Sequence, residues 1–228
     1  MSPVRHSAHR AARTLARRGF TILETMMALV IIGVGVLAFV DAQAAFTASN
    51  NWSSRAATGM LLANEVRELT RRLPRHDPVT GLSLSGSGGA AVLVGWGREG
   101  GEVAIADLDD LDDFDGITFG DLGTFAGPID AFGNIVPDLN VDGSVRTDAE
   151  GAVAPLLGWS QTVTVQKVSL YNYDTVLNNA ATQAATAQMA GAAVGAFPLR
   201  VTVVVNFTEP STGETSEVTR ITWVVPVE

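Results

Sequence analysis

The chain begins with a short basic stretch that is followed by a long apolar one. Residues 20–40 contain a single charged side chain, Glu24, and residues 26–40 contain no polar side chain at all. At a rise of about 1.5 Å per residue, a helix of this length reaches about 30 Å, which matches the hydrocarbon core of a bilayer. The pattern therefore predicts a transmembrane helix over residues 20–40.

Helical periodicity continues after this span, but on one face only. Apolar or small residues recur at intervals of three or four, a spacing that places them along one stripe of a helix. They are Trp52, Ala56, Gly59, Leu62, Val66, Leu69 and Leu73, and Pro74 and Pro78 then supply a stop. Residues 41–75 are therefore predicted to be the amphipathic half of one helix that starts at Phe20 and ends near Leu73.

The remainder, residues 76–228, has the pattern of a β-rich globular domain. β-Branched residues alternate with polar ones in Trp159–Leu170, Leu199–Phe207 and Glu217–Val225. A loop at 209–213 separates the last two segments, so they predict an antiparallel hairpin. The expected fold class is α+β, with the long helix packed on an antiparallel sheet. The alanine-rich insertion 178–196 predicts a short surface helix.

The charge distribution along the chain is uneven. The formal net charge is −9, but residues 1–19 carry five arginines and no acid, so the rest of the chain is strongly acidic. An acidic body repels phosphate backbones, and no nucleic-acid partner is expected. Basic residues before one apolar span predict a single-pass membrane protein with a cytoplasmic N-terminus.

A secretory signal peptide would share the basic start and the apolar run. The segment Ala42-Gln43-Ala44 offers signal peptidase a cleavage site before Ala45, which would release a secreted soluble β-rich binding domain. Helical patterning that continues well past residue 44 favours the membrane helix over this alternative.

The segment Arg17-Arg18-Gly19-Phe20-Thr21-Ile22-Leu23-Glu24 resembles the processing site of type IV prepilins and of type II secretion pseudopilins. The resemblance implies that prepilin peptidase cuts between Gly19 and Phe20, removes the basic leader 1–19 and methylates the new amino group of Phe20. It also implies that residues 20–40 leave the lipid bilayer of the bacterial inner membrane to form a filament core. Further implied partners are other pilin or pseudopilin subunits and an inner-membrane assembly platform. The filament itself would be periplasmic or extracellular.

Glu24 is the charged residue that the apolar span has to accommodate. A carboxylate five residues into such a span is costly unless it is paired, so it marks a functional position. The family resemblance implies that Glu24 meets the positive N-terminal amine of a neighbouring subunit during assembly. An interfacial glutamate that merely reaches the lipid headgroups is the structural alternative.

Within this family, two features favour a minor pilin or a pseudopilin. The acidic run 109–116 resembles a segment of PilV-like minor pilins and of minor pilins of the mannose-sensitive haemagglutinin kind. Many major pilins also carry a C-terminal cysteine pair, whereas this chain has no cysteine.

Two acidic segments are candidates for binding calcium, which prefers oxygen ligands. The loop 107–116 contains six aspartates, of which Asp109, Asp112, Asp113 and Asp115 are the candidate ligands. Asp138, Asn140 and Asp142 reproduce the opening of a calcium loop, but Ala149 stands where a closing acid should be. The alternatives are a solvated acidic loop and an Asx-type turn. Calcium is a possible cofactor, and none is required.

Catalysis has little support in the sequence. The only histidines are His6, His9 and His76, no cysteine is present, and no glycine loop has the residues of a phosphate-binding motif. His76 is expected to be a solvated residue at the end of the helix. No catalytic residue is predicted, although clustered aspartates leave a membrane-anchored carboxylate enzyme as an alternative.

Overall fold

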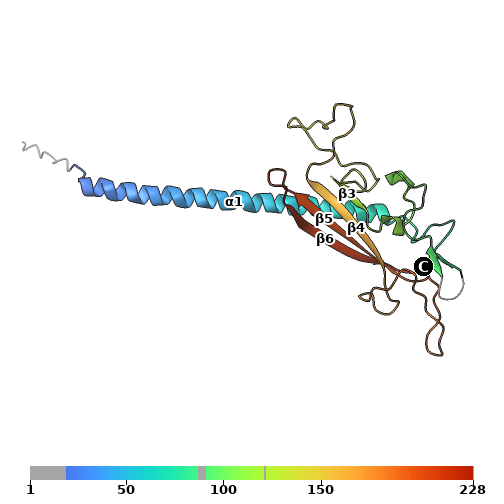
Figure 1. Cartoon of the computed structure of the whole chain (residues 1–228). Coiled ribbons are helices and arrows are strands. Elements are labelled where there is room, and N and C mark those ends of the chain that lie inside the picture. Colours follow the sequence, from blue (N-terminus) through green and yellow to red (C-terminus); the bar gives the residue numbers. More distant parts are fainter. Residues whose placement is uncertain (1–18, 87–90, 121, 228) are drawn as a thin grey trace, which may run out of the picture. The chain divides into compact units, whose positions relative to one another are not determined.

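The computed structural model describes residues 19–86, 91–120 and 122–227. It contains one long helix, α1 (Ile22–Thr70), and an antiparallel sheet formed mainly by the C-terminal part of the chain (Figure 1). The predicted α+β fold class is therefore confirmed. Contacts within the chain divide it into two units, which meet between Asn51 and Trp52.

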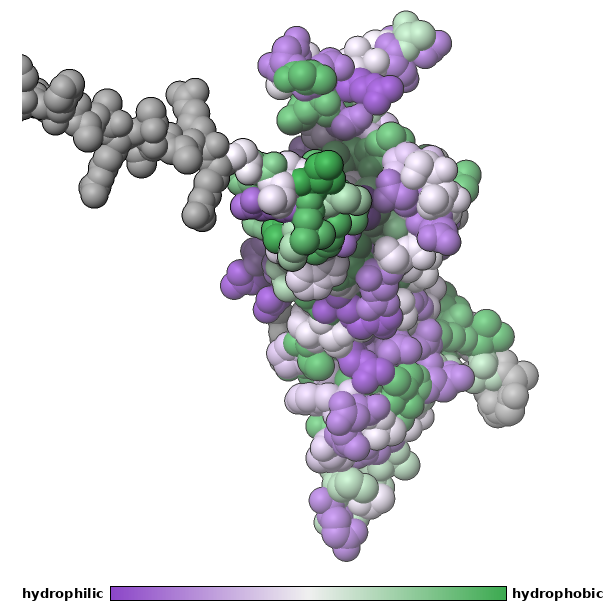
Figure 2. Space-filling view, turned by 90° about the vertical axis from the view of Figure 1, so that its left-hand side faces the viewer, coloured by the Kyte–Doolittle hydropathy of each residue, from purple (hydrophilic) through white to green (hydrophobic). Residues whose placement is uncertain are grey.

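The first unit consists, in its described part, of the N-terminal portion of α1. Thr21 caps the helix, because its Oγ1 accepts a hydrogen bond from the backbone N–H of Glu24 at 3.2 Å. Every described residue from 19 to 51 is exposed, including large apolar side chains such as Ile31, which is 68% exposed. Figure 2 shows such side chains uncovered at the N-terminal end of α1. The segment is long and apolar enough to cross a membrane.

In the second unit, the remaining part of α1 has one buried stripe. Gly59, Leu62, Ala63 and Val66 are buried there, and Leu69 and Leu73 pack against the core. The predicted stripe is confirmed from Gly59 onward, but it is wrong at Trp52, whose side chain is 73% exposed. The side chain of Trp52 lies outside the hydrophobic core.

Gly59 sets how closely this part of α1 approaches the sheet. A Cβ atom at this position would lie 2.8 Å from Cγ1 of Val218, which belongs to strand β6 (Thr215–Val225). Any side chain would therefore push the helix and this strand apart. The glycine weakens the helix in isolation but allows close packing.

The sheet has the order β3-β4-β5-β6, and every neighbouring pair is antiparallel. Its other strands are β3 (Thr118–Gly120), β4 (Trp159–Lys167) and β5 (Leu199–Thr208). Buried and partly exposed residues alternate along β4 and β5. The inward face packs Val163, Val165, Val201, Val203 and Val205 into the same core as Leu62 and Val66. The three predicted strands and the C-terminal hairpin are confirmed.

Smaller elements lie between α1 and β3. A short hairpin pairs β1 (Ser83–Ser85) with β2 (Val92–Val94), and two single-turn 3₁₀ helices follow, η2 (Ile105–Asp107) and η3 (Asp112–Phe114). The acidic run therefore folds into compact turns, a feature that the sequence analysis did not predict.

The alanine-rich insertion is not a helix, so that prediction is wrong. Its backbone doubles back instead, and Gln183 and Ala192 exchange two hydrogen bonds of 2.9 Å. Lys167 holds both ends, since its ammonium donates to the carbonyls of Asn179 and Val194. Helix propensity is a weak preference, and these tertiary contacts outweigh it.

Candidate functional site

The N-terminal candidate site lies where α1 begins. Gly19, Phe20 and Thr21 precede the first helical residue, so the Gly19–Phe20 peptide bond is outside the helix and its backbone is open to a protease. Phe20 is 78% exposed. The leader residues that precede Gly19, including all five arginines, lie outside the described residues.

Glu24 lies in the first turn of α1 and is exposed. Among the residues that the structure describes, no basic side chain forms an ion pair with it. Its carboxylate is thus available to a partner, and a negative charge in the first turn also suits the positive end of the helix dipole.

The second candidate is a group of carboxylates in the second unit, which we call the carboxylate cluster. Its members come from the loop before η2 and from the acidic run: Glu99, Glu102, Asp109, Asp110, Asp112 and Asp113. Asp110, Asp112 and Asp113 are at most 1% exposed. The alternative of a solvated acidic loop is therefore wrong for these three aspartates.

Apolar residues within the acidic run explain why the aspartates are buried. Leu108, Leu111, Phe114 and Ile117 recur at every third position, and all four belong to the hydrophobic core. The backbone N–H of Leu111 also donates to the carbonyl of Pro74 at 2.9 Å. Burial of these apolar side chains holds Asp110, Asp112 and Asp113 below the surface.

Backbone hydrogen bonds satisfy one oxygen of each of two aspartates. Asp110 Oδ1 accepts from the N–H of Asp113 at 3.1 Å, and Asp113 Oδ2 accepts from the N–H groups of Asp109 and Asp110 at 3.1 and 3.2 Å. Four carboxylate oxygens of the cluster are shielded from solvent and have no hydrogen-bond partner among the residues that the structure describes. These are Asp110 Oδ2, Asp112 Oδ1, Asp113 Oδ1 and Glu99 Oε2.

Burial disfavours the charged form of these carboxylates. It raises the pKa of Asp110 to about 8, and contact with Asp112 adds to the shift. It raises the pKa of Asp113 to about 7, with a contribution from the charge of Asp110, and that of Asp112 to about 6. Without a cation, the cluster therefore retains protons close to neutral pH.

His76 borders the cluster and is not the solvated residue that was predicted. Its side chain is 9% exposed, and its Nδ1 lies 3.1 Å from Asp112 Oδ2. Burial, assisted by the charge of Arg75, lowers the pKa of His76 to about 4, so the ring is neutral at pH 7. A neutral ring can donate a hydrogen bond to Asp112, but it brings no positive charge.

Asp115 plays a different part from its neighbours. Its Oδ1 accepts from the N–H of Val165 at 2.9 Å, and its Oδ2 accepts from Nε1 of Trp96 at 3.3 Å. Both oxygens are used to connect the acidic run to β4 and to the loop after β2. The structure therefore gives Asp115 a structural role.

The ligand atoms that converge form two overlapping groups, and Asp113 belongs to both. One group is Glu99, Glu102 and Asp113, and the other is Asp109, Asp110 and Asp113. In each group the oxygens lie within 4.8 Å of one another. The structure thus brings together Asp109 and Asp113 of the predicted ligands and leaves Asp112 and Asp115 outside.

Sequence analysis missed Asp110, Glu99 and Glu102 as potential ligands. Leu108, Leu111 and Phe114 were the available signal for Asp110, because a three-residue apolar period within an acidic run indicates a buried face. Glu99 and Glu102 lie outside the acidic run and share no sequence pattern with it. Only the tertiary fold places them beside it.

The second predicted calcium segment lies in an excursion of three tight turns between β3 and β4. Asp138 forms an ion pair with Arg146 at 3.1 Å, Asp142 accepts from the N–H and hydroxyl of Ser144, and Asn140 donates to the same hydroxyl. In the described part of the chain, these three side chains belong to no group of converging ligand atoms. Their contacts are those of Asx-type turns.

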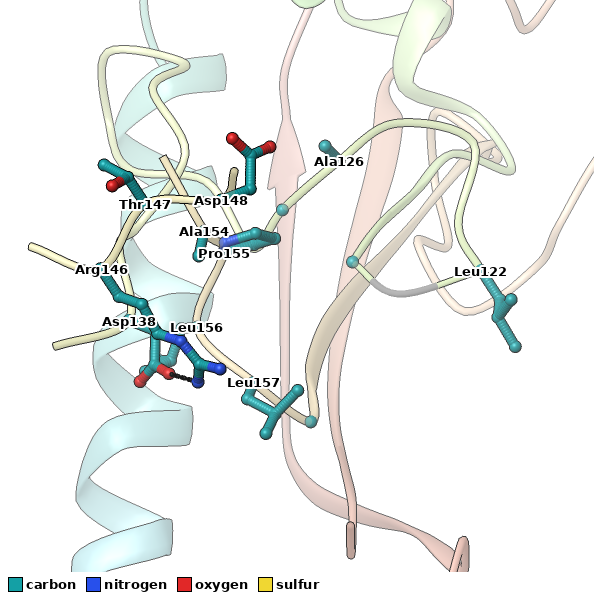
Figure 3. Close-up of a pocket in the computed structure, with 13 residues that line it drawn as sticks. Leu122, Ala126, Asp138, Arg146, Thr147, Asp148, Ala154, Pro155, Leu156 and Leu157 are labelled. Carbon is teal, nitrogen blue, oxygen red and sulfur yellow. Dashed lines mark hydrogen bonds and ion pairs between the residues drawn. The ribbon is translucent and has the colours of Figure 1, made fainter. Parts of the chain in front are cut away.

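An open cavity of about 460 Å³ lies beside this excursion (Figure 3). The Asp138–Arg146 pair lies on one side, with Pro155, Leu156 and Leu157 nearby. Asp148 also lines it, but its Oδ1 accepts from the N–H groups of Glu150 and Ala152. The charged groups here are therefore already engaged.

Comparison with known proteins identifies the N-terminal site. A family model for the prokaryotic N-terminal methylation motif matches residues 15–40. In comparisons with the curated proteins and with the solved structures, nothing matches the chain. The motif and the long apolar helix fit the type IV pilin-like family, and they indicate a prepilin-processed structural protein with a single-pass membrane anchor.

Proposed function

We propose that this protein is a minor pilin or pseudopilin, a structural subunit of a type IV pilus or of a type II secretion-like filament. The observation that carries the proposal is the methylation motif over residues 15–40, which coincides with the exposed apolar part of α1. A helix of this kind requires an apolar environment, which lipid or neighbouring helices can supply.

Processing follows from the position of the motif. Prepilin peptidase cleaves between Gly19 and Phe20, where the described chain is not helical, and methylates the amino group of Phe20. The removal of the basic leader leaves an apolar helix with one positive amine and one carboxylate, Glu24. The chain is held with its N-terminus on the cytoplasmic side until assembly, since basic residues are retained there.

Assembly exchanges lipid for protein around the same helix. Glu24 then pairs with the methylated amine of a neighbouring Phe20, so that two charges compensate each other in apolar surroundings. At a separation of about 4 Å and an effective dielectric constant near 20, such a pair is worth about 4 kcal/mol before desolvation is subtracted. The pairing fixes the axial register between subunits.

The exposed glycines of α1 suit such packing. Within the described first unit, Cβ atoms at Gly33 and Gly35 would meet nothing within 4 Å. Packing within this unit therefore does not require a glycine at either position. Small residues allow neighbouring helices to approach closely in apolar surroundings. They therefore support a helix-packed filament core.

The acidic run and the absence of cysteine favour a minor pilin or pseudopilin over a major pilin. The acidic second unit would face the periplasm or the exterior, with the inner-membrane platform, lipid and other subunits as partners.

The test is intact-mass and N-terminal peptide analysis of the protein from the membrane and sheared-filament fractions of its host. The expected result is a mature chain that begins with N-methylated Phe20 and is present in both fractions. A mature chain that begins at Ala45 would overturn the proposal and identify a secreted domain. A matched variant, Gly19→Leu, should accumulate as the unprocessed precursor in the membrane.

A further inference from the structure

The carboxylate cluster has more negative groups than the protein neutralises. In the described residues, no lysine or arginine lies within ion-pair distance of Glu99, Glu102, Asp110 or Asp113. The nearby ammonium of Lys167 is buried, but it donates to two backbone carbonyls. Buried carboxylates without a counter-charge are unfavourable unless they bind a proton or a cation.

Unpartnered oxygens provide an independent indication of a ligand. Asp110 and Asp113 are each 1% exposed, and each has one carboxylate oxygen that is shielded from solvent and accepts no hydrogen bond from the described part of the chain. Buried polar atoms nearly always have a partner in folded proteins. The backbone N–H groups that orient the opposite oxygens hold these two carboxylates in place, so their free oxygens are preorganised.

Within each of the two groups, the spacing of the oxygens suits an ion of the size of calcium. Two oxygens that bind the same Ca²⁺ at about 2.4 Å lie at most about 4.8 Å apart. In both overlapping groups the carboxylate oxygens lie within 4.8 Å of one another. Calcium accepts irregular sets of six to eight oxygens, whereas magnesium demands a smaller octahedron and keeps its waters.

We propose that Glu99, Glu102 and Asp113, whose ligand oxygens form one of the two converging groups, bind one Ca²⁺ ion. The ion joins the loop before η2 to η3, which contains Asp113. Because the chain has no cysteine, a cation takes the place that a disulfide occupies in other small extracellular domains. Asp109 and Asp110 form the other group with Asp113, and the side chain of Asp109 is exposed.

The competing state is a cluster that holds protons in place of a cation. In that state Asp110 and Asp112 would share a proton in a hydrogen bond between their carboxyl groups. Calcium would then have no effect on the protein. The two states differ in their response to added calcium and to charge-neutralising substitutions of similar shape, so one experiment separates them.

The experiment is a calorimetric titration of CaCl₂ into the full mature chain, purified in detergent and stripped with EGTA, at pH 7.5. We expect one Ca²⁺ per chain, and we expect Asp113→Asn and Glu102→Gln each to weaken binding by about tenfold or more. Both substitutions retain an oxygen that can accept the existing backbone hydrogen bonds. Asp142→Asn, in the other calcium-like segment, is the control and should bind calcium as the unmodified chain does.

Thermal unfolding of the same samples provides the second readout. Calcium should raise the Tm of the unmodified chain and of Asp142→Asn, but not that of Asp113→Asn. If Asp113→Asn does not fold, Glu102→Gln replaces it in this comparison. Glu102 is only partly buried, so its substitution should not prevent folding. The proposal is overturned if a folded chain shows no binding at millimolar calcium, if two ions bind, or if only Asp142→Asn loses binding.

Discussion

Gln161 provides the most direct test of how the second unit is held together. Its side chain is fully buried, and its amide connects α1, β4 and the loop after β3. Nε2 donates to the carbonyls of Leu62 and Ile129 at 2.8 and 3.0 Å, and Oε1 accepts from the N–H of Ile129 at 2.7 Å. Gln161→Met preserves the shape of the side chain and removes all three hydrogen bonds.

The expected cost follows from the groups that would be left without partners. Ile129 is 0% exposed, so its N–H and its carbonyl would both lose partners that water cannot replace. Each such group costs about 1–3 kcal/mol, and the loss of stability should therefore be about 2–6 kcal/mol. The carbonyl of Leu62 adds less, because it also lies within the hydrogen-bonded part of α1.

Gln166→Met is the matched control on the same strand. Gln166 is only partly buried and accepts one hydrogen bond, from Arg200 at 2.8 Å. Its substitution should cost no more than about 1 kcal/mol. Urea unfolding of the full chain in detergent, followed by tryptophan fluorescence to which the buried Trp159 contributes, measures both. A cost below about 1 kcal/mol at position 161, or equal costs at both positions, would refute the reasoning.

The remaining predictions concern the core, the filament and the carboxylates. Leu62→Ala should destabilise the second unit by about 2–5 kcal/mol in urea unfolding, whereas Met60→Ala, at a half-exposed position of the same helix, should cost far less. Glu24→Gln should leave methylation intact, as mass spectrometry can check, but should deplete the subunit from sheared filaments; normal incorporation would contradict the pairing with a neighbouring amine. Calcium-free protein should lose thermal stability as the pH rises from about 5 to 8. The pKa values of Asp110 and Asp113 are raised in the folded state, so in this pH range the folded state still holds protons that the unfolded state has released. The folded state is therefore disfavoured as the pH rises. A stability that rises with pH in EGTA would contradict this sign.

Local pattern was sufficient for the long helix and for three strands. The three- or four-residue stripe and the alternation in β4 and β5 each reflect a single element that buries one face, whereas the apolar run is recognised by its length and composition. The methylation motif over residues 15–40 is a linear pattern, so it could be recognised without any tertiary contact.

Tertiary structure decided the state of the polar residues. Asp110, Asp113, His76 and Gln161 would each be solvated in an isolated segment, since hydration is the default for such side chains. Their burial depends on neighbours from distant parts of the chain, such as Pro74 beside the acidic run.

The alanine-rich insertion shows the same limit for backbone conformation. Its composition favours a helix, but contacts from Lys167 and from its own Gln183 impose a folded-back loop. By itself, the sequence determined the long apolar helix, the methylation motif and the main strands, because each depends on a local pattern of residues. Only the tertiary structure decided which carboxylates meet and lose their water, because that depends on how the segment 99–113 folds back on itself and packs against Pro74 and the hydrophobic core.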